Sequence, residues 1–456
     1  MKLVKSLLLG SAAGIAAVAG AQAADLPSRK AAPVEYVRVC SAYGAGFFYI
    51  PGTDTCLRVG GRVRAEYAIG ERYSDFQDAY GTRARGRLNI DARTATAYGT
   101  LRAFIRYELT NNTGIYTAGT APFNTGANVP GLVRGAAGTG SLVDLAFVQF
   151  GPITAGRAQS FFDFYASDYN FASIRTADSR VNLLAYTATF GSGFSATISA
   201  EDRTSGTVGR ELPGVVFNPI TGVNSGAAVV QGQDYPDLVA SLRVDQGWGS
   251  AQLSGALGQR NYAVATNVLA VDGDEMVFAV QGGVKINLPF LANGDALFLQ
   301  AAYADGAIGY LGWSNNSFGL GRLGRLGLAD ASINPITGSV KNTTGFSLVA
   351  ALRHFWTPTL RSEVGISYSQ LKLGYLDGAS LPGLFTRSLD PKEFLVAGNL
   401  IWSPVSGLDI GVEVLYSNLE VRSPVGVVNN ANVRSGVLGI KSEDSFSGRL
   451  RIQRDF

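Results

Sequence analysis

The sequence predicts an all-β protein, a transmembrane antiparallel β-barrel of about sixteen strands. Two observations carry this prediction. From Leu57 to the last residue, stretches of about 10 residues alternate in polarity, and the gaps between them are alternately short and long. Period-two polarity puts one face of a strand against an apolar medium and the other against water. Tight turns at one end and long loops at the other are typical of a barrel that crosses a membrane.

Composition agrees with this fold class. The chain has 456 residues with 57 Gly, 24 Phe and 19 Tyr, and 16% of its residues are charged. Soluble proteins carry about 25% charged residues, and a transmembrane helix needs an apolar run of about 20 residues. No such run follows the N-terminal region. Glycine and aromatic rings without apolar helices fit strands joined by turns, with rings at the membrane interfaces.

The first 23 residues are predicted to be a secretory signal peptide. Lys2 and Lys5 form its positive region, residues 7–18 its apolar core, and Ala21 to Ala23 a small-residue cleavage site. A membrane anchor is the alternative, but the apolar core is short and rich in Gly and Ala. Removal of 23 residues leaves a mature chain of 433, with 36 basic against 35 acidic residues. This near-neutral balance argues against a nucleic-acid partner.

Cys40 and Cys56 are the two cysteines of the chain, and both lie in the exported part. Outside the cytosol such a pair indicates a disulfide rather than a metal site or a nucleophile. Two free buried thiols are the alternative. The disulfide closes a loop within an N-terminal segment, residues 24–56, and stabilises it by about 3 kcal/mol. No metal site or cofactor is expected.

Residues 57–456 are predicted to form the barrel. An even number of strands is what a closed antiparallel barrel from one chain needs. The sixteen expected strands start near Leu57, Thr82, Tyr98, Ser141, Ile153, Arg180, Phe194, Tyr235, Ser250, Asp274, Asp295, Thr344, Leu360, Lys392, Leu408 and Glu443.

The polar faces of the first three strands carry a ladder of arginines. In residues 57–67, Leu57, Val59, Val63 and Tyr67 share one face, whereas arginines occupy the other. A barrel of sixteen strands encloses an aqueous lumen. Water in the lumen solvates these arginines, and the same water provides a path for transport. The ladder consists of Arg62, Arg64, Arg83, Arg85, Arg87, Arg102 and Arg106.

The loop that follows the fifth strand is rich in aromatic rings and carries Asp163, Asp168 and Asp178. Burying one such ring is worth about 1.5–3 kcal/mol, so this third outer loop is expected to fold against the inner wall and narrow the pore. Its carboxylates then face the arginine ladder and create a transverse field. The alternative is that the arginines only solvate the wall and pair with nearby acids.

The chain ends in a strand, residues 449–456, with Leu450, Ile452 and Phe456 on one face. Termini of soluble chains usually fray, so an ordered final strand needs a partner. In a barrel it pairs with the first strand and removes the last edge.

The sequence resembles the general porins of alphaproteobacteria over essentially the whole mature chain. The stretches that carry the resemblance are residues 39–47, 50–61 and 156–163, together with the terminal Phe456. The family implies an outer-membrane, usually homotrimeric, sixteen-stranded pore for passive diffusion of small hydrophilic solutes and ions, with an inward-folded third loop. By this resemblance Arg157 belongs to the pore wall, and Asp163 and Asp168 to the constriction loop.

The resemblance also implies partners. Phe456 resembles the recognition signal of the barrel-assembly machinery, and the barrel is expected to contact lipid and lipopolysaccharide of the outer membrane. Rival functions are a channel selective for a sugar or an anion, a barrel enzyme, and a secreted soluble adhesin. No catalytic residue is expected, because the one histidine, His354, stands at a strand end beside Phe355 and Trp356, in an interfacial aromatic girdle.

Two further motifs are better explained without function. Residues 319–324 match a dinucleotide-binding fingerprint but stand in a Gly-rich loop with no βαβ unit around them. Residues 272–275, Asp-Gly-Asp-Glu, lack the rest of a calcium loop and are expected to form a solvated turn.

Overall fold

The computed structural model describes residues 38–71, 78–116, 137–203, 228–230, 233–265, 270–313, 328, 330–333, 340–373, 390–428 and 437–456. The chain forms two compact units, residues 1–56 and residues 57–456. The predicted signal peptide and the glycine motif at 319–324 lie outside the described residues. In the described part of the chain, no helix is both long enough and apolar enough to cross a membrane.

The N-terminal unit is built around a disulfide. Cys40 and Cys56 are bonded, with their Cα atoms 5.9 Å apart, which confirms the predicted pair. Both cysteines are buried with Phe47, and two tyrosines pack against this cluster. The connecting chain holds a short 3₁₀ turn, η2 (Ser41–Tyr43), and a two-residue strand, β1 (Phe48–Tyr49). So small a cluster buries little apolar surface, and the covalent bond compensates for this.

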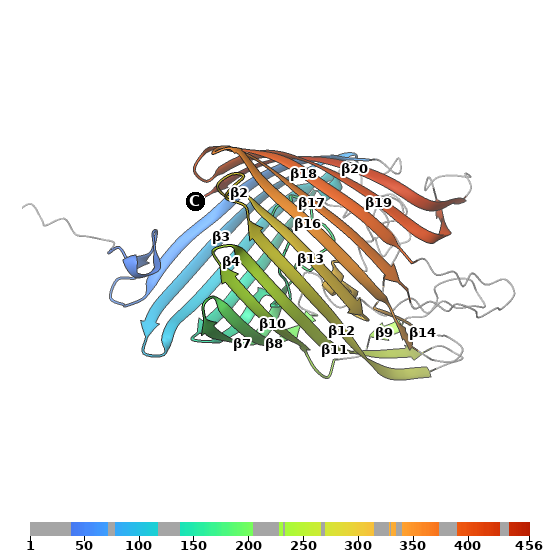
Figure 1. Cartoon of the computed structure of the whole chain (residues 1–456), viewed down its shortest axis with the longest axis horizontal. Coiled ribbons are helices and arrows are strands. Elements are labelled where there is room, and N and C mark those ends of the chain that lie inside the picture. The colour runs from blue at the N-terminus through green and yellow to red at the C-terminus, as the bar shows by residue number, and fades with distance from the viewer. Residues whose placement is uncertain are drawn as a thin grey trace, which may run out of the picture. The chain divides into compact units, whose positions relative to one another are not determined.

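The second unit is a closed barrel of sixteen antiparallel strands (Figure 1). Strand β20 pairs with β19 on one side and with β2 on the other, which closes the ring. In ring order the strands are β2 (Cys56–Gly70), β3 (Tyr80–Thr96), β4 (Gly99–Thr113), β5 (Ala137–Phe150), β6 (Ile153–Gln159), β7 (Arg180–Gly191), β8 (Phe194–Asp202), β10 (Asp237–Gln246), β11 (Gly249–Ala265), β12 (Ala270–Asn287), β13 (Ala296–Asp305), β16 (Thr344–Thr357), β17 (Leu360–Lys372), β18 (Lys392–Val405), β19 (Leu408–Val428) and β20 (Val437–Asp455).

Smaller elements accompany the barrel strands. Strand β9 (Ala228–Val230) pairs with β11, and β14 (Ala331–Ile333) pairs with β15 (Val340–Asn342) in a separate small sheet. Two 3₁₀ turns, η3 (Gly114–Tyr116) and η5 (Ile308–Leu311), follow β4 and β13. Each of the sixteen predicted barrel strands is found.

The largest differences from the predicted strand bounds are at the long-loop ends of the hairpins. Strand β12 starts at Ala270, so residues 272–275 belong to a strand and not to the expected solvated turn. There the Asp274 carboxylate accepts a hydrogen bond of 2.8 Å from the Gln259 amide on β11. A run of polar residues by itself indicates a loop, but here polar side chains form a hydrogen bond across two neighbouring strands.

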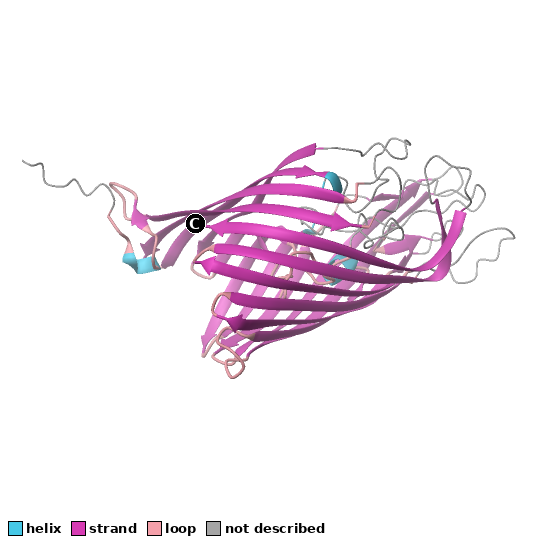
Figure 2. Ribbon diagram, turned by 90° about the horizontal axis from the view of Figure 1, so that it is seen from above, coloured by secondary structure: helices cyan, strands magenta, loops and turns pink. Residues whose placement is uncertain are grey.

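Alternate residues of each strand point to opposite sides of the wall. On β10, Leu238 and Leu242 are 48% and 58% exposed, whereas Val239 and Ser241 between them are buried. Large apolar side chains recur on this outer face in every barrel strand. Figure 2 shows the strands running side by side with a common tilt, as closure of a sheet requires.

The outer face ends in aromatic side chains near the short turns. Tyr98, Phe290 and Trp356 are among the most exposed of them. His354 lies beside Trp356, with ring centroids 4.5 Å apart, and its Nδ1 is 2.6 Å from a carboxylate oxygen of Asp295. Rings at this level match the aromatic girdle that anchors a barrel at the membrane interface.

Candidate functional site

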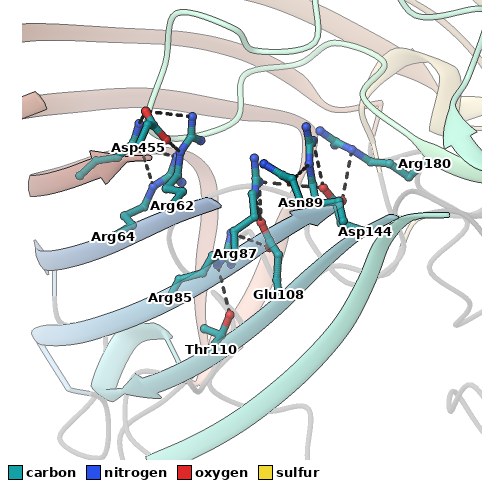
Figure 3. Close-up of polar contacts among 12 residues, drawn as sticks. Arg62, Arg64, Arg85, Arg87, Asn89, Glu108, Thr110, Asp144, Arg180 and Asp455 are labelled. Atoms are coloured by element: carbon teal, nitrogen blue, oxygen red, sulfur yellow. Dashed lines mark hydrogen bonds and ion pairs between the residues drawn. The ribbon is translucent and has the colours of Figure 1, made fainter. Parts of the chain in front are cut away.

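The inner faces of β2, β3 and β4 carry arginines, and Figure 3 shows Arg62 and Arg64 of β2 beside Arg85 and Arg87 of β3 with their polar partners. Alternation along each strand keeps them on one side of the wall. Their side chains are partly exposed: 27% for Arg62 on β2, 25% for Arg85 on β3 and 25% for Arg106 on β4. The arginine ladder predicted on these strands is therefore brought together on one surface. Arg449 and Arg451 of β20 extend it across the barrel seam, which the sequence pattern did not identify.

Glu66 is the most heavily shared carboxylate of this surface, and its side chain is fully buried. It lies 2.5 Å from Arg83, 2.8 Å from Arg451 and 3.8 Å from Arg449. The pairing register explains the contact with β20, because Glu66 stands directly opposite Arg451. One carboxylate on β2 therefore serves three guanidinium groups from two neighbouring strands, β3 and β20.

Three other carboxylates are shared in the same way. Glu108 lies 2.5 Å from Arg87, which stands opposite it, and 3.4 Å from Arg85. Asp91 and Asp144 each serve further arginines. Asp91 lies 2.8 Å from Arg93 and 2.9 Å from Arg102, and Asp144 lies 3.4 Å from Arg106, 3.5 Å from Arg180 and 3.9 Å from Arg87. The surface thus holds more arginines than acids to neutralise them.

We call this surface the basic arc. It comprises eleven arginines and the six carboxylates paired with them: Arg62, Arg64, Arg83, Arg85, Arg87, Arg93, Arg102, Arg106, Arg180, Arg449 and Arg451, with Glu66, Asp91, Glu108, Asp144, Asp178 and Asp455.

Residues 160–179, between β6 and β7, form a second feature, which we call the inner segment. Its backbone is hydrogen-bonded by polar side chains of distant strands. The Gln252 amide of β11 donates to the carbonyl oxygen of Phe161 at 3.2 Å, and the Gln281 amide of β12 donates to that of Phe162 at 2.8 Å. Further along, Glu413 of β19 accepts from the backbone N–H of Ala172 at 2.7 Å. These contacts are all on the buried faces of the strands.

Aromatic packing also holds the inner segment. Phe298 of β13 packs against Phe164, Tyr165 and Tyr169, with ring centroids 5.7, 5.0 and 5.2 Å apart. Each such ring contributes burial of roughly 150–250 Å² and edge-to-face geometry adds a further small gain. The aromatic residues that made this loop conspicuous in the sequence are the ones that pack it in place.

A second segment, residues 306–313, packs against the inner segment and was not predicted. Trp313 is fully buried, and its indole N–H donates to the Ser369 hydroxyl of β17 at 2.7 Å. The Arg175 guanidinium stacks 3.9 Å from the Trp313 ring and donates to the Gly312 carbonyl oxygen at 2.9 Å. Arg175 also pairs with Glu393 of β18. The sequence signal that could identify this segment is the run from Ile308 to Trp313, rich in large apolar residues, shortly after β13.

The three predicted loop acids have three different surroundings. Asp178 pairs with Arg180 at 2.5 Å, and Asp168 is exposed. Asp163 is buried and accepts hydrogen bonds from the Gln159 amide at 2.5 Å and from the Ser179 backbone N–H at 2.7 Å. Burial raises the pKa of Asp163 to about 7. Asp163 therefore joins the two ends of the inner segment and does not face the arginine ladder, which differs from the expectation.

Arg157 also differs from the expectation that it lines the wall with the other arginines. It stands opposite Ala146 on β5 and Asn182 on β7, and Asn182 shares its face with the exposed Leu184. Its guanidinium donates to the Val143 carbonyl oxygen at 2.9 Å. The register thus places it on the outer face of β6, because inward and outward positions alternate strictly along a strand.

A closed antiparallel barrel of sixteen strands, apolar outside and lined with charges inside, defines an integral outer-membrane channel for passive diffusion. A family model described as "Porin subfamily" matches residues 25–448. The chain belongs to this family of porins.

Curated relatives agree with this assignment. The chain is 34% identical over 316 residues to Porin Omp2b of Brucella canis and of Brucella suis biovar 1, which covers 67% of this chain and 75% of theirs. Among solved structures, the outer membrane channel DcaP of Acinetobacter baumannii has the same fold, with a TM-score of 0.58 and 16% sequence identity. That likeness covers 90% of this chain and 99% of the DcaP chain. These relatives are channels, in keeping with the expectation that the chain is a channel rather than an enzyme.

Proposed function

We propose that the inner segment folds into the lumen and narrows it, so that diffusing solutes pass between this segment and the basic arc. The observation that carries the proposal is that the inner segment contacts strands that lie far apart in the barrel. Its first residues are hydrogen-bonded to β11, and its Phe171 carbonyl oxygen accepts from Arg449 of β20 at 2.5 Å and from Arg451 at 3.1 Å. Strands β11 and β20 are well separated in the ring, so contact with the inner faces of both supports a path across the interior.

The charges support a selective path. Arginines of the basic arc gather on neighbouring strands of the wall (Figure 3), and the inner segment contributes an exposed carboxylate, Asp168. Opposed charges across a narrow water-filled passage orient water and sort solutes by charge and dipole. On this proposal Arg62, Arg64, Arg83, Arg85, Arg87, Arg102 and Arg106 act as wall residues. Asp168 acts as the constriction acid, whereas Asp178, which was also expected in this role, is paired with Arg180 of the arc.

Conductance of the purified mature protein in planar lipid bilayers tests this function. We expect stepwise conductance, with a reversal potential in a salt gradient that moves in opposite directions in Arg85→Ser and Asp168→Asn. The matched control is Arg454→Gln. Arg454 is exposed and lies between Gln453 and Asp455 of the inner face, so alternation along β20 places it on the outer face. A folded, inserted protein that conducts no ions contradicts the diffusion pathway.

We also propose that three copies of the chain assemble. The resemblance to general porins suggests it, and Arg157 on the outer face of β6 supports it, because an arginine facing lipid costs about 2–4 kcal/mol at mid-membrane. A neighbouring copy that covers Arg157 removes this cost. Chemical cross-linking in mild detergent should give a trimer band, which weakens in Arg157→Leu if the interface needs the guanidinium. A monomer at every cross-linker concentration contradicts this proposal.

A further inference from the structure

Arg64 differs from its neighbours in the partners of its guanidinium group. It stands directly opposite Gln453, and its Nε and Nη2 donate to the Gln453 amide oxygen at 3.0 and 2.7 Å. Within the described part of the chain this neutral oxygen is its hydrogen-bond partner, whereas Arg62 beside it pairs with Asp455 at 2.5 Å. The charge of Arg64 is therefore solvated by an amide and not neutralised by an adjacent acid.

The charges around Arg64 are mostly of its own sign. Its strongest electrostatic interactions are with Arg451, Glu66, Arg62 and Arg85. Glu66 is the one acid among these four, and it already lies within 2.8 Å of Arg451. The cluster of Arg62, Arg64, Arg85 and Arg451 thus concentrates positive charge at one place on the wall.

The rest of the basic arc does not compensate for this excess. Its eleven arginines outnumber its six carboxylates by five. The inner segment contributes the Phe171 carbonyl oxygen, the Asp178 carboxylate that is paired with Arg180, and the exposed carboxylate of Asp168, and this one further acid does not balance an excess of five arginine charges. Carboxylates on other strands, such as Glu201 and Asp237, are buried and hydrogen-bonded elsewhere. A solute that moves along the arc therefore meets net positive charge.

We propose that Arg64, with Arg62, Arg85 and Arg451, forms a binding site for small multivalent oxyanions of the phosphate type, and that the channel conducts anions in preference to cations. The proposal rests on the passage proposed above. A guanidinium presents a planar fork of N–H donors that matches the oxygens of phosphate or carboxylate. Arginines that line a pore select anions and phosphate in this way, provided that each site is weak enough to release its ion.

Partial exposure keeps the proposed site weak. The Arg62 and Arg85 side chains are 27% and 25% exposed, so water and salt screen their charges. An anion held here exchanges with the lumen instead of blocking it permanently. We expect occupancy at millimolar phosphate, and weaker occupancy as chloride concentration rises.

The test uses the full mature protein in planar bilayers, with inorganic phosphate and pyrophosphate as probes. In a potassium chloride gradient the reversal potential of the wild-type channel should have the sign of anion preference. Added pyrophosphate should reduce the chloride current in a saturable manner. In Arg64→Gln the pyrophosphate concentration for half-reduction should rise about tenfold, the effect of losing a charged hydrogen-bond donor.

Two variants make the outcome specific. Arg64→Lys keeps the charge but loses the planar fork, so it should retain anion preference while the pyrophosphate effect weakens. Arg454→Gln makes the same charge change on the outer face of β20 and should behave as wild type. Absence of conductance contradicts the proposed function itself. Conductance with cation preference, or equal pyrophosphate responses in Arg64→Gln and Arg454→Gln, overturns only the anion site.

Discussion

Phe456 and Gly61 pair through both of their backbone polar groups. The Gly61 N–H donates to a Phe456 main-chain oxygen at 2.9 Å, and the Phe456 N–H donates to the Gly61 carbonyl oxygen at 3.0 Å. A Cβ atom added at Gly61 would lie 2.6 Å from the Phe456 ring and 2.5 Å from the Arg87 carbonyl oxygen. The last residue of the chain is therefore seated where β2 has no side chain, and this contact helps to close the barrel.

Gly61→Val should weaken barrel closure. The added side chain has to displace the Phe456 ring or the backbone of β3, and such overpacking costs about 1–3 kcal/mol. We expect a lower temperature for the loss of the compact band in semi-native gel electrophoresis. The matched control is Gly86→Val on β3, where an added Cβ meets no atom within 4 Å. Equal losses in both variants would show that the Phe456 contact has no special part in closure.

Phe456→Ala tests the role of the terminal residue in assembly. The resemblance to porins predicts that this aromatic residue is read by the assembly machinery. Expression in a Gram-negative host should give less folded barrel in the outer membrane, while refolding in detergent from denaturant should lose little. If both yields fall equally, Phe456 acts through barrel stability alone.

Glu66→Gln should change both stability and selectivity. Removing the charge leaves Arg83, Arg449 and Arg451 without their shared carboxylate, and breaking a buried ion pair costs about 3 kcal/mol. The same change adds one net positive charge to the basic arc. Guanidinium unfolding should therefore show a lower midpoint, and the reversal potential should move further toward anion preference. A shift toward cations contradicts the electrostatic assignment of the arc.

Asp455→Asn is the matched control for the charge change. Asp455 pairs with Arg62 at 2.5 Å, but its side chain is 43% exposed, so the pair is screened by water. We expect a stability loss of less than about 1 kcal/mol. The contrast with Glu66→Gln separates the effect of burial from that of charge.

The strand number and the arginine ladder could be predicted because both are local patterns. Alternation of charged and apolar residues fixes the face of Arg62 and Arg85 from sequence alone. The position of Arg157 could not be fixed in this way, because it follows a glycine with φ of 121° in a short strand that leads directly into the inner segment. Its face depends on register with Asn182, which is a long-range property.

The hydrogen-bond and ion-pair partners of the loop acids could not be predicted from the sequence either. Asp163 and Asp178 have the same side chain, yet Asp163 is buried and accepts from the Ser179 backbone N–H and the Gln159 amide, whereas Asp178 is paired with Arg180. Which of them faces the arginines depends on how the aromatic rings of the inner segment pack on β13. The buried Trp313 is a similar case, since only tertiary contacts distinguish it from an exposed loop aromatic.

Trp313→Ala should loosen the inner segment. Trp313 packs between Arg175 of the inner segment and Ser369 of β17, so its removal leaves a cavity and costs about 3–5 kcal/mol of local packing. Single-channel recordings should show more frequent current fluctuations and a larger mean conductance. The control is Trp356→Ala on the outer face, where the indole is 63% exposed. Unchanged current noise in Trp313→Ala would indicate that residues 306–313 do not brace the segment.

Asp163 should make the anchoring of the inner segment depend on pH. Its pKa is raised from 3.8 to about 7, chiefly by burial, so the folded protein holds a proton that the unfolded chain has already released. Between pH 4 and pH 7 the folded state therefore binds more protons, and stability falls as the pH rises. Below pH 4 the Asp163 carboxyl is protonated in both the folded and the unfolded state, and its contribution to the free energy of unfolding is at its greatest.

Asp163→Asn removes this titration while keeping an oxygen that can accept from Gln159 and Ser179. The variant should lose less stability than the wild type between pH 5 and pH 8. The measurement is the midpoint of guanidinium unfolding at several pH values in a fixed detergent, with Asp274→Asn as the control because the Asp274 side chain is exposed. If the wild-type midpoint rises with pH over this range and Asp163→Asn abolishes the rise, folding lowers the pKa of Asp163 instead of raising it. That result would mean that the hydrogen bonds from Gln159 and Ser179 outweigh the cost of burying the charge.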